Sequence, residues 1–326
     1  MNPTHPSQTP HHVRRMWYPF LLLALIASIF FTEIRFNLNL PESFEHLEPL
    51  QKGEGPTPFQ YRILVPAILL GLENLTGETG KNLWFRWDVA ITFIGMFLLV
   101  HYLRVFYQSL LFCMLMSLIG YSLLAYNLVI PQELPMLFPY DMTSLTVMLA
   151  GCLALHRKKW LLFYIVFIPG TFNKETTCFL SLYCICLYFR DIPHRKLALH
   201  VAVQIALWVA IKTFLYLHFS ANAERGAFVF TLFRNLHYLC DFQVMSEFLS
   251  IFGFLGLFLL LYYNGLSHPM IKRIIWVLPV YILGMLCVGV VNENRIYLEM
   301  TPIVMAGVAD LCEQAIKNSS PGAIKG

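Results

Sequence analysis

Long apolar segments, separated by short polar stretches, follow one another along most of this 326-residue chain. Hydrophobic residues make up 57% of the sequence and charged residues 13%, about half the charged share of a typical soluble domain. The apolar residues come in continuous runs, and the ten-residue alternating segments of a β-barrel do not occur. The sequence therefore predicts an all-α fold, a polytopic transmembrane helix bundle.

The apolar segments predict about ten spans, several of them shorter than the ~20 residues that a perpendicular span needs. The predicted spans are 17–31, 88–106, 109–130, 141–156, 160–172, 176–189, 197–219, 247–263, 273–291 and 296–312. The pair 160–172 and 176–189 is expected to form either two short spans or a re-entrant hairpin. Residues 17–312 then form one integral membrane domain, and the polar ends, 1–16 and 313–326, are expected to be disordered.

The apolar stretch 61–75 decides the predicted topology. If it spans the membrane, the basic run 157–159 lies outside; if it lies flat or re-enters within the first outer loop, 32–87, the basic loops gather inside as the positive-inside rule requires. We expect the second arrangement, with both termini cytoplasmic, in a bacterial inner membrane. The inner side then carries Arg14, Arg15, Arg104, Arg157, Lys158, Lys159, Arg190, Arg195, Lys196, Lys272, Arg273, Lys317 and Lys325, against Asp191, Asp310 and Glu313.

The basic residues are scattered over short loops, which argues against nucleic-acid binding despite the formal net charge of +4. The eight cysteines have neither a CxxC spacing nor another metal-binding or redox pattern, and most lie inside apolar runs. We expect all eight to be packing residues. They are Cys113, Cys152, Cys178, Cys184, Cys186, Cys240, Cys287 and Cys312.

Ionisable residues next to apolar segments are predicted to meet on the outer side, where such groups are costly and normally kept for function. Asn173, Lys174 and Glu175 give the strongest local signal, because they separate two short apolar runs. Membrane proteins build sites at broken helices of this kind, although a plain polar turn would look the same. The residues expected to converge are Asp141, Asn173, Lys174, Glu175, Glu293 and Arg295.

Three further positions leave alternatives open. Asp141 follows Tyr140 at the start of a span and is either a helix N-cap or a reactive carboxylate. Arg62 either binds a phosphate or is an interfacial anchor. Arg295 and Glu299 are four residues apart, so we expect Glu299 to hold Arg295 while Glu293 points elsewhere; a local salt bridge that closes a tight turn is the alternative.

The first outer loop is rich in glutamate, including Glu33 directly after the first span and Glu42 after a proline. Three interpretations of such a carboxylate are open: a general base, a ligand of a metal that binds a phosphate, or a solvated surface charge. The sequence indicates no cofactor and no metal site. Lys212 lies within the seventh span and needs a partner or water, which the sequence does not identify.

Together these motifs resemble the C-type glycosyltransferase (GT-C) superfamily across most of the chain. The resemblance rests on the acidic outer loop after the first helix and on the segments PFQYRILVP, PYDMTSL, FNKETT and NENRIYLEMTP. The chain departs from the usual signature, because spaced glutamates replace an Asp-x-Asp or Glu-x-Asp pair after the first helix.

The resemblance implies transfer of a sugar from a polyprenyl-phosphate donor to an extracytoplasmic acceptor. Arg62, Lys174 and Arg295 would then bind the donor phosphate, and the stretch 61–75 would wall a groove for the lipid. The catalytic base would be one of Glu33, Glu42, Asp141, Glu175 and Glu293, with Tyr140, Asn173 and Glu299 completing the polar site. The partners implied are the lipid-linked donor and membrane lipid.

Two other functions remain open from the sequence. A transporter or flippase for a lipid-linked or anionic substrate would use the same charges, but it should place charges at several depths and show repeat symmetry. In this sequence the candidate charges lie at the outer ends of the predicted spans, and no internal repeat is visible. A non-catalytic subunit of a cell-envelope assembly is the other alternative, in which changes at Glu175 or Arg295 would affect assembly rather than turnover.

Overall fold

A computed structural model describes residues 10–38, 45–130, 137–222 and 229–319, and all regular secondary structure in these ranges is helical. The first half contains α1 (Pro10–Leu38), α3 (Leu47–Lys52), η1 (Phe59–Tyr61), α4 (Leu64–Thr76), α5 (Gly80–Leu103), α6 (Leu110–Leu123), α7 (Ala125–Leu128), α8 (Asp141–His156) and α9 (Trp160–Asn173). The second half contains η2 (Glu175–Cys178), α10 (Phe179–Tyr188), α11 (His194–His218), η3 (Ser220–Asn222), α12 (Leu232–Tyr238), α13 (Phe242–Leu249), α14 (Leu255–Leu261), η4 (Tyr263–Gly265), α15 (Pro269–Ile274), α16 (Val277–Val288), η5 (Asn294–Met300) and α17 (Thr301–Ser319).

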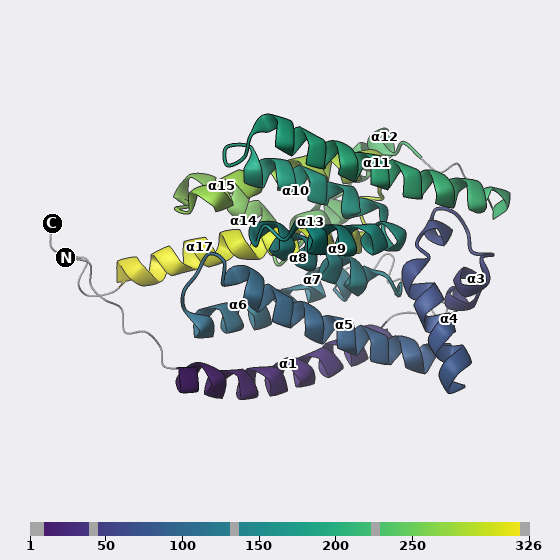
Figure 1. Ribbon diagram of the computed structural model, residues 1–326, viewed down its shortest axis with the longest axis horizontal. Helices are drawn as coiled ribbons and strands as arrows, with labels where there is room; N and C mark the ends of the chain where they lie inside the picture. The colour runs from purple at the N-terminus through teal and green to yellow at the C-terminus, as the bar shows by residue number, and fades with distance from the viewer. Residues whose placement is uncertain (1–9, 39–44, 131–136, 223–228, 320–326) are drawn as a thin grey trace.

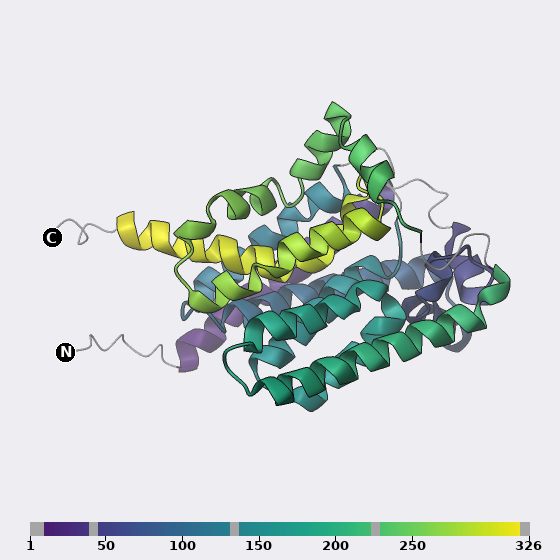
Figure 2. The same ribbon diagram turned by 90° about the horizontal axis from the view of Figure 1, so that it is seen from above.

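The long helices run side by side along the longest axis of the molecule (Figures 1 and 2). α1 begins and α17 ends at the same end of the bundle, which we call the terminal end. α3 and α4 lie at the opposite end, the cap end, where α4 runs across the direction of the long helices (Figure 1). The chain thus passes back and forth between two ends, and the stretch around α4 covers one of them.

Five helical stretches in the described residues are long and apolar enough to cross a membrane: Arg15–Leu38, Gly80–Leu103, Leu110–Leu128, His194–His218 and Pro269–Val288. In α11 only 11% of the most apolar window is buried within the protein. Its exposed side chains include Leu199, Ile205, Phe214 and Leu217, and α1 exposes Leu22, Leu23, Ile26 and Phe30. Apolar surface on this scale requires an apolar environment. The total of ten spans and the flat placement of α4 stay predictions.

α8 lies at the centre of the bundle, and its side chains are buried almost all round. It packs against α5 on one side and α9 on the other, while α5 also packs against α1 and α6. Close approach and interhelical hydrogen bonds fix these contacts. A Cβ on Gly95 of α5 would collide with the Tyr121 hydroxyl of α6, and Ser117 Oγ donates to the Met96 carbonyl at 2.8 Å.

Several element boundaries differ from the prediction. The span predicted at 247–263 is two helices, α13 and α14, because Phe252, Gly253 and Phe254 adopt positive φ, which stops an α-helix. α1 begins at Pro10, and α17 continues to Ser319, so helix covers parts of both ends predicted to be disordered. Helical hydrogen bonds need no apolar side chains, and hydrophobicity therefore underestimates helix length.

The cysteines are free thiols, and Cys113, Cys152 and Cys184 are buried as expected. Cys240 is the correction, because it is exposed between α12 and α13. Its thiol contacts the Leu236 carbonyl at 3.4 Å, within the same local turn. A single apolar residue in a mixed segment says little about burial, which depends on what packs over it.

A buried ion pair joins α1 to α5 near the cap end. Arg35 Nη1 lies 2.5 Å from Asp88 Oδ2, with both side chains almost fully buried, and Thr32 Oγ1 donates to the same oxygen at 3.3 Å. Arg35 also lies over the Phe31 ring, 5.8 Å from its centroid. Two charges are brought out of water together, so removal of one leaves the other uncompensated.

We expect Arg35→Met to destabilise the protein by about 3–5 kcal/mol, because it leaves Asp88 buried without its cation. The double variant Arg35→Met/Asp88→Leu should recover most of this loss. Lys52→Met, which removes a partner from an exposed pair with Glu48, is the matched control and should change little. Unfolding of the detergent-solubilised protein measures each value; equal losses for Arg35→Met and Lys52→Met would contradict the expectation.

The topology is tested by thiol labelling in a variant without the native cysteines. The labelling positions are Lys52→Cys before α4, Leu75→Cys near the end of α4, and Lys159→Cys just after the end of α8. We expect a membrane-impermeant reagent to label the first two from one side and Lys159→Cys from the other. Labelling of positions 52 and 75 from opposite sides would show that α4 crosses the membrane.

Candidate functional site

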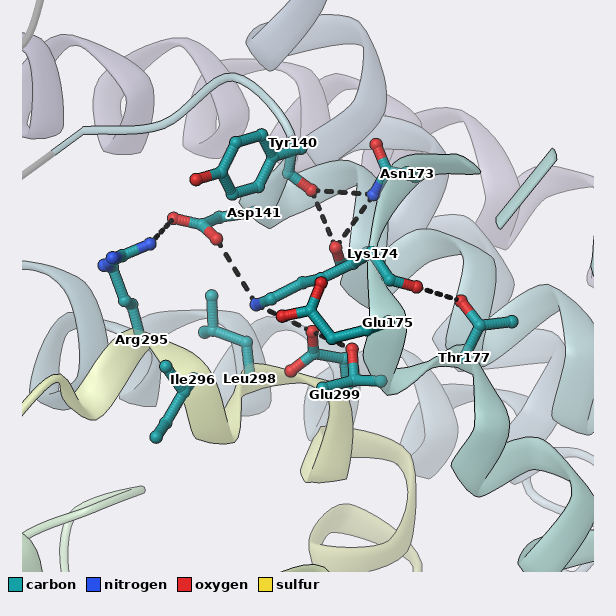
Figure 3. A network of polar contacts seen from close by, with 12 residues as sticks. Tyr140, Asp141, Asn173, Lys174, Glu175, Thr177, Arg295, Ile296, Leu298 and Glu299 are labelled. Carbon is teal, nitrogen blue, oxygen red and sulfur yellow. Dashed lines mark hydrogen bonds and ion pairs between the residues drawn. The ribbon is translucent and has the colours of Figure 1, made fainter. Parts of the chain in front are cut away.

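A network of charged side chains lies at the cap end, inside the fold (Figure 3). Five separate pieces of chain supply it: the residues before α4, the start of α8, the break between α9 and α10, α11, and η5 with the residue before it. Its cations are Arg62, Lys174, Arg295 and Lys212, and its anions are Asp141, Glu175, Glu293 and Glu299. Each positive charge is therefore balanced by one negative charge.

Lys174 is the central cation of the network. Its amine lies 2.8 Å from Glu299 Oε1 and 3.4 Å from Asp141 Oδ1, and its side chain is 2% exposed (Figure 3). Glu299 also accepts hydrogen bonds from Thr176 at 3.0 Å and from the Tyr281 hydroxyl at 2.9 Å. This carboxylate is fully engaged, which a buried charge requires.

Arg295 joins the same network from η5. Its Nη1 lies 3.4 Å from Asp141 Oδ2, and its Nη2 donates to Glu293 Oε2 at 2.6 Å. The prediction that Glu299 holds Arg295 is wrong. Residues 294–300 form a 3₁₀-helix, in which residues four apart do not share a face, and Glu293 precedes it in a non-helical conformation that turns back to its second neighbour.

Asp141 thus bridges two cations, one with each carboxylate oxygen. It is the first residue of α8 but not its N-cap; that position belongs to Tyr140, and the Asp141 carboxylate faces Lys174 and Arg295 instead. Its place in the first turn still puts a negative charge at the positive end of the helix dipole. Asp141 is therefore not the N-cap of α8; its carboxylate bridges Lys174 and Arg295.

Arg62 forms the outer part of the network. Its Nε donates to Glu175 Oε2 at 3.1 Å, its Nη2 pairs with the other Glu175 oxygen, and its Nη1 donates to the Tyr140 hydroxyl at 3.0 Å. Burial by itself would lower the pKa of Arg62, but the neighbouring Glu175 carboxylate raises it well above the ordinary arginine value. Arg62 is an inward-facing charge rather than a surface anchor.

Aromatic rings hold the two arginines in place. The Arg62 guanidinium lies 4.8 Å from the Tyr140 ring centroid, and that of Arg295 lies 4.2 Å from the Phe138 ring. These two rings stack on each other at 5.2 Å, and Phe59 stacks on Phe138 at 4.9 Å. Burial raises the pKa of Tyr140, so its hydroxyl stays neutral and accepts from Arg62. Rings from two segments that are distant in sequence, PFQYR and FPYD, therefore form one aromatic stack.

The break between α9 and α10 is built by its own polar residues. Lys174 is extended, with φ −158° and ψ 146°, which ends α9 at Asn173. Thr177 Oγ1 donates at 2.8 Å to the carbonyl of Gly170, which also accepts the Lys174 amide at 2.9 Å. Asn173 Nδ2 donates to the Tyr140 carbonyl at 3.0 Å and to Ser144 Oγ at 2.8 Å. The segment FNKETT is thus an ordered break locked to α8.

Lys212 of α11 is placed beside this break. Its charge acts on the Glu175 carboxylate, and its amine is enclosed without a hydrogen bond among the described residues. Trp208, one turn earlier, donates its indole N–H to the Glu175 carbonyl at 2.8 Å. The partner that the sequence left open for Lys212 is therefore Glu175, through a longer-range charge interaction.

Several partners were not expected from the sequence. They are Ser144, Thr176, Trp208, Tyr281 and Phe138. No local signal distinguishes these residues from ordinary packing residues, because each lies in or beside an apolar run. Only the neighbouring helix gives each of them its role.

Exposure separates the four carboxylates. The side chains of Asp141 and Glu299 are 0% and 3% exposed, whereas those of Glu293 and Glu175 are 17% and 37% exposed. The cavity beside Glu299 holds only about 10 Å³, room for about one water molecule. A ligand can therefore reach this network only at its rim, where Glu175 and Glu293 lie.

Two predicted glutamates are not part of the network. Glu33 is exposed on α1 and accepts a hydrogen bond from Asn37 at 2.9 Å, one turn further on. Glu42 lies outside the described residues. Within the residues that the structure describes, no group of three or more His, Cys, Asp or Glu side chains is arranged to hold a metal ion.

The fold and this network together define a multi-helix protein, apolar enough to be membrane-embedded, with a buried and balanced charge network at one end. No protein-family model matches the chain, and neither a curated protein nor a solved structure matches it.

We expect Asp141→Asn to cost about 3–5 kcal/mol of stability, because both Lys174 and Arg295 lose their shared counter-charge in a buried site. Glu293→Gln should cost about 1 kcal/mol, since its carboxylate is partly exposed and Arg295 keeps Asp141. Glu78→Gln, which alters a surface pair with Arg86, is the control and should be near neutral. Unfolding measurements that ranked Asp141→Asn with the control would rule out a central role for Asp141.

Proposed function

We propose that this protein is a GT-C-like membrane glycosyltransferase that moves a sugar from a polyprenyl-phosphate donor to an extracytoplasmic acceptor at the cap end. The observation that carries the proposal is that Arg62 and Arg295 each pair with a carboxylate at the exposed rim of the network. A guanidinium binds phosphate with the same planar, two-point geometry that it uses for carboxylate. A donor phosphate can therefore take the place of Glu175 and Glu293.

The surroundings of Arg62 support a lipid-linked donor. Arg62 lies between η1 and α4 in the chain, and the ring of Tyr61 in η1 lies 6.4 Å from the ring of Tyr216 in α11. α4 and α11 expose large apolar side chains, including Leu70, Leu75, Phe214 and Leu217. A polyprenyl chain needs an apolar surface that is open to the side, and these helices offer one beside a cation.

When the donor phosphate replaces Glu175 as the partner of Arg62, it also releases a catalytic base. Once phosphate occupies Arg62, the Glu175 carboxylate is free to accept the proton of an acceptor hydroxyl. The acceptor oxygen then forms a bond to the anomeric carbon of the sugar, and the bond from that carbon to the phosphate oxygen breaks, leaving its electrons on the lipid phosphate. Arg62 and Arg295 stabilise the negative charge that develops there.

The remaining charged residues have a positioning role in this proposal. Asp141 and Glu299 are too deeply buried to meet an acceptor, and they fix Lys174 and Arg295. Glu175 is the preferred base because its side chain is the most exposed of the four carboxylates, and Glu293 is the second choice.

The position of the charges favours an enzyme over a transporter. Residues 142–155 of α8, 160–172 of α9 and 277–288 of α16 contain no Asp, Glu, Lys or Arg. A pathway for an anionic substrate through the bundle would need such groups at intermediate depth. The charges of this chain instead gather at the two ends of these helices.

The donor site is tested by titrating the purified full-length protein with undecaprenyl phosphate and following binding by native mass spectrometry. We expect Arg62→Gln to weaken binding at least about tenfold, the effect of losing a charge-assisted contact. Glu175→Gln should bind the phosphate as well as the wild type or more tightly, because it frees Arg62. Arg86→Gln, an exposed arginine near the same end, is the matched control.

Catalysis is tested separately with polyprenyl-phosphate sugars in proteoliposomes, by release of the lipid phosphate in the presence of candidate acceptors. Glu175→Gln should lower turnover about 10²-fold or more while donor binding persists. Undecaprenyl phosphate binding that is indifferent to Arg62→Gln would overturn the assignment of the donor site. Donor binding with unchanged turnover in Glu175→Gln would remove Glu175 as the base.

A further inference from the structure

A second cavity lies at the terminal end, at the opposite end of the helices from the charge network. Its volume is about 390 Å³, and it is lined by Trp17, His101, Arg104, Val105, Leu110 and Arg157. These residues come from α1, from the end of α5 and the turn after it, from the start of α6 and from the end of α8. Three stretches that are distant in sequence, around residues 17, 101–110 and 157, therefore line one cavity.

The two arginines of this cavity have no carboxylate partner among the described residues. The Arg104 guanidinium donates to the Gln108 carbonyl at 2.8 Å, and no ion pair is formed by Arg104 or Arg157 in that part of the chain. The acidic side chains at this end are engaged elsewhere: Asp191 with Arg273, Asp310 with Ser267, and Glu313 with Lys317. The terminal segments 1–9 and 320–326 contain no Asp or Glu.

Two other features of the cavity favour an anion. α6 begins at Leu110, one of the lining residues, so the positive end of a 14-residue helix dipole lies beside the cavity. Ser109 satisfies only the amide of Phe112 with its side chain. Trp17 stacks on His101, with ring centroids 5.5 Å apart and planes at 23°, and gives the cavity a flat, partly apolar wall.

We propose that this cavity is a binding site for a phosphate group, held by Arg104, Arg157 and the first turn of α6. Basic residues are expected on this side by the positive-inside rule, but that rule requires only their presence and not their convergence on one cavity. Two uncompensated guanidinium groups and a helix N-terminus form a phosphate-binding arrangement. The phosphate is a monoester or diester, carried either by an anionic phospholipid or by a soluble metabolite.

The lipid source has structural support from the neighbouring surface. α1 continues from Trp17 into a face that exposes Leu22, Leu23 and Ile26 along the length of the bundle. A phospholipid with its phosphate in the cavity could lay its acyl chains on this face. A soluble phosphate ester would use the arginines and the α6 terminus alone.

The experiment uses the full-length protein in nanodiscs and compares two probes. In one arm, the nanodiscs contain phosphatidylcholine with increasing fractions of brominated phosphatidylglycerol, and quenching of Trp17 fluorescence is measured in a variant whose other tryptophans are Phe. In the other arm, inorganic phosphate is titrated into phosphatidylcholine nanodiscs by calorimetry. Each arm is run with Arg104→Gln/Arg157→Gln and with Arg190→Gln/Lys196→Gln, a double control at the same end that does not line the cavity.

We expect Arg104→Gln/Arg157→Gln to weaken binding at least about tenfold in one arm, whereas the control variant binds as the parent does. Loss in the phosphatidylglycerol arm identifies a lipid headgroup as the ligand, and loss in the inorganic phosphate arm identifies a soluble phosphate. The proposal is overturned if neither probe binds, or if the two double variants behave alike in both arms. All four substituted residues are exposed, so the variants should remain folded.

Discussion

The Asp141 carboxylate is the interaction on which the cap end depends. Its two oxygens face two cations from different parts of the chain, Lys174 from the break after α9 and Arg295 from η5. The carboxylate itself is placed at the start of α8, the most enclosed helix of the bundle. One buried negative charge thus fixes the relative positions of three segments, and the cost of its burial is offset only while both cations stay in place.

The network around Asp141 is balanced, and this balance limits what it can do. The inner Glu299 carboxylate contacts Lys174, Thr176 and Tyr281, and the adjoining cavity admits about one water molecule. At the rim, Arg62 pairs with Glu175, and Arg295 pairs with Glu293 while it also contacts the inner Asp141. In the proposed function, an incoming phosphate exchanges with these two rim carboxylates.

The two ends of the bundle contrast in their electrostatics. At the cap end every cation of the network has a nearby carboxylate, and aromatic rings enclose the arginines. At the terminal end Arg104 and Arg157 line an open cavity without such partners in the described residues. Between them the central helices are apolar. The arginines at the two ends therefore have different surroundings, with ion pairs to carboxylates at the cap end and none in the described residues at the terminal end.

The sequence by itself determined the class of structure and much of the cap-end cluster. Continuous apolar runs leave a helix bundle as the only way to satisfy backbone hydrogen bonds in an apolar environment, so the all-α fold followed directly. The side on which Asp141, Lys174, Glu175 and Arg295 meet followed from helix order alone, because successive segments alternate direction. The break at FNKETT was visible because polar residues interrupt two short apolar runs.

Only the tertiary structure decided which charge pairs with which. Sequence spacing favoured Glu299 as the partner of Arg295, but the 3₁₀ geometry of η5 turned Glu299 toward Lys174 instead. Arg62 finds Glu175 across 113 positions in the chain, and Tyr281 finds Glu299 from another helix, through packing that leaves no trace in local sequence. Likewise, hydrophobicity could not separate α13 from α14, because that break comes from backbone dihedral angles. Local composition fixes which residues reach an end of the bundle, whereas pairing depends on rotations and approach distances that only the packed helices set.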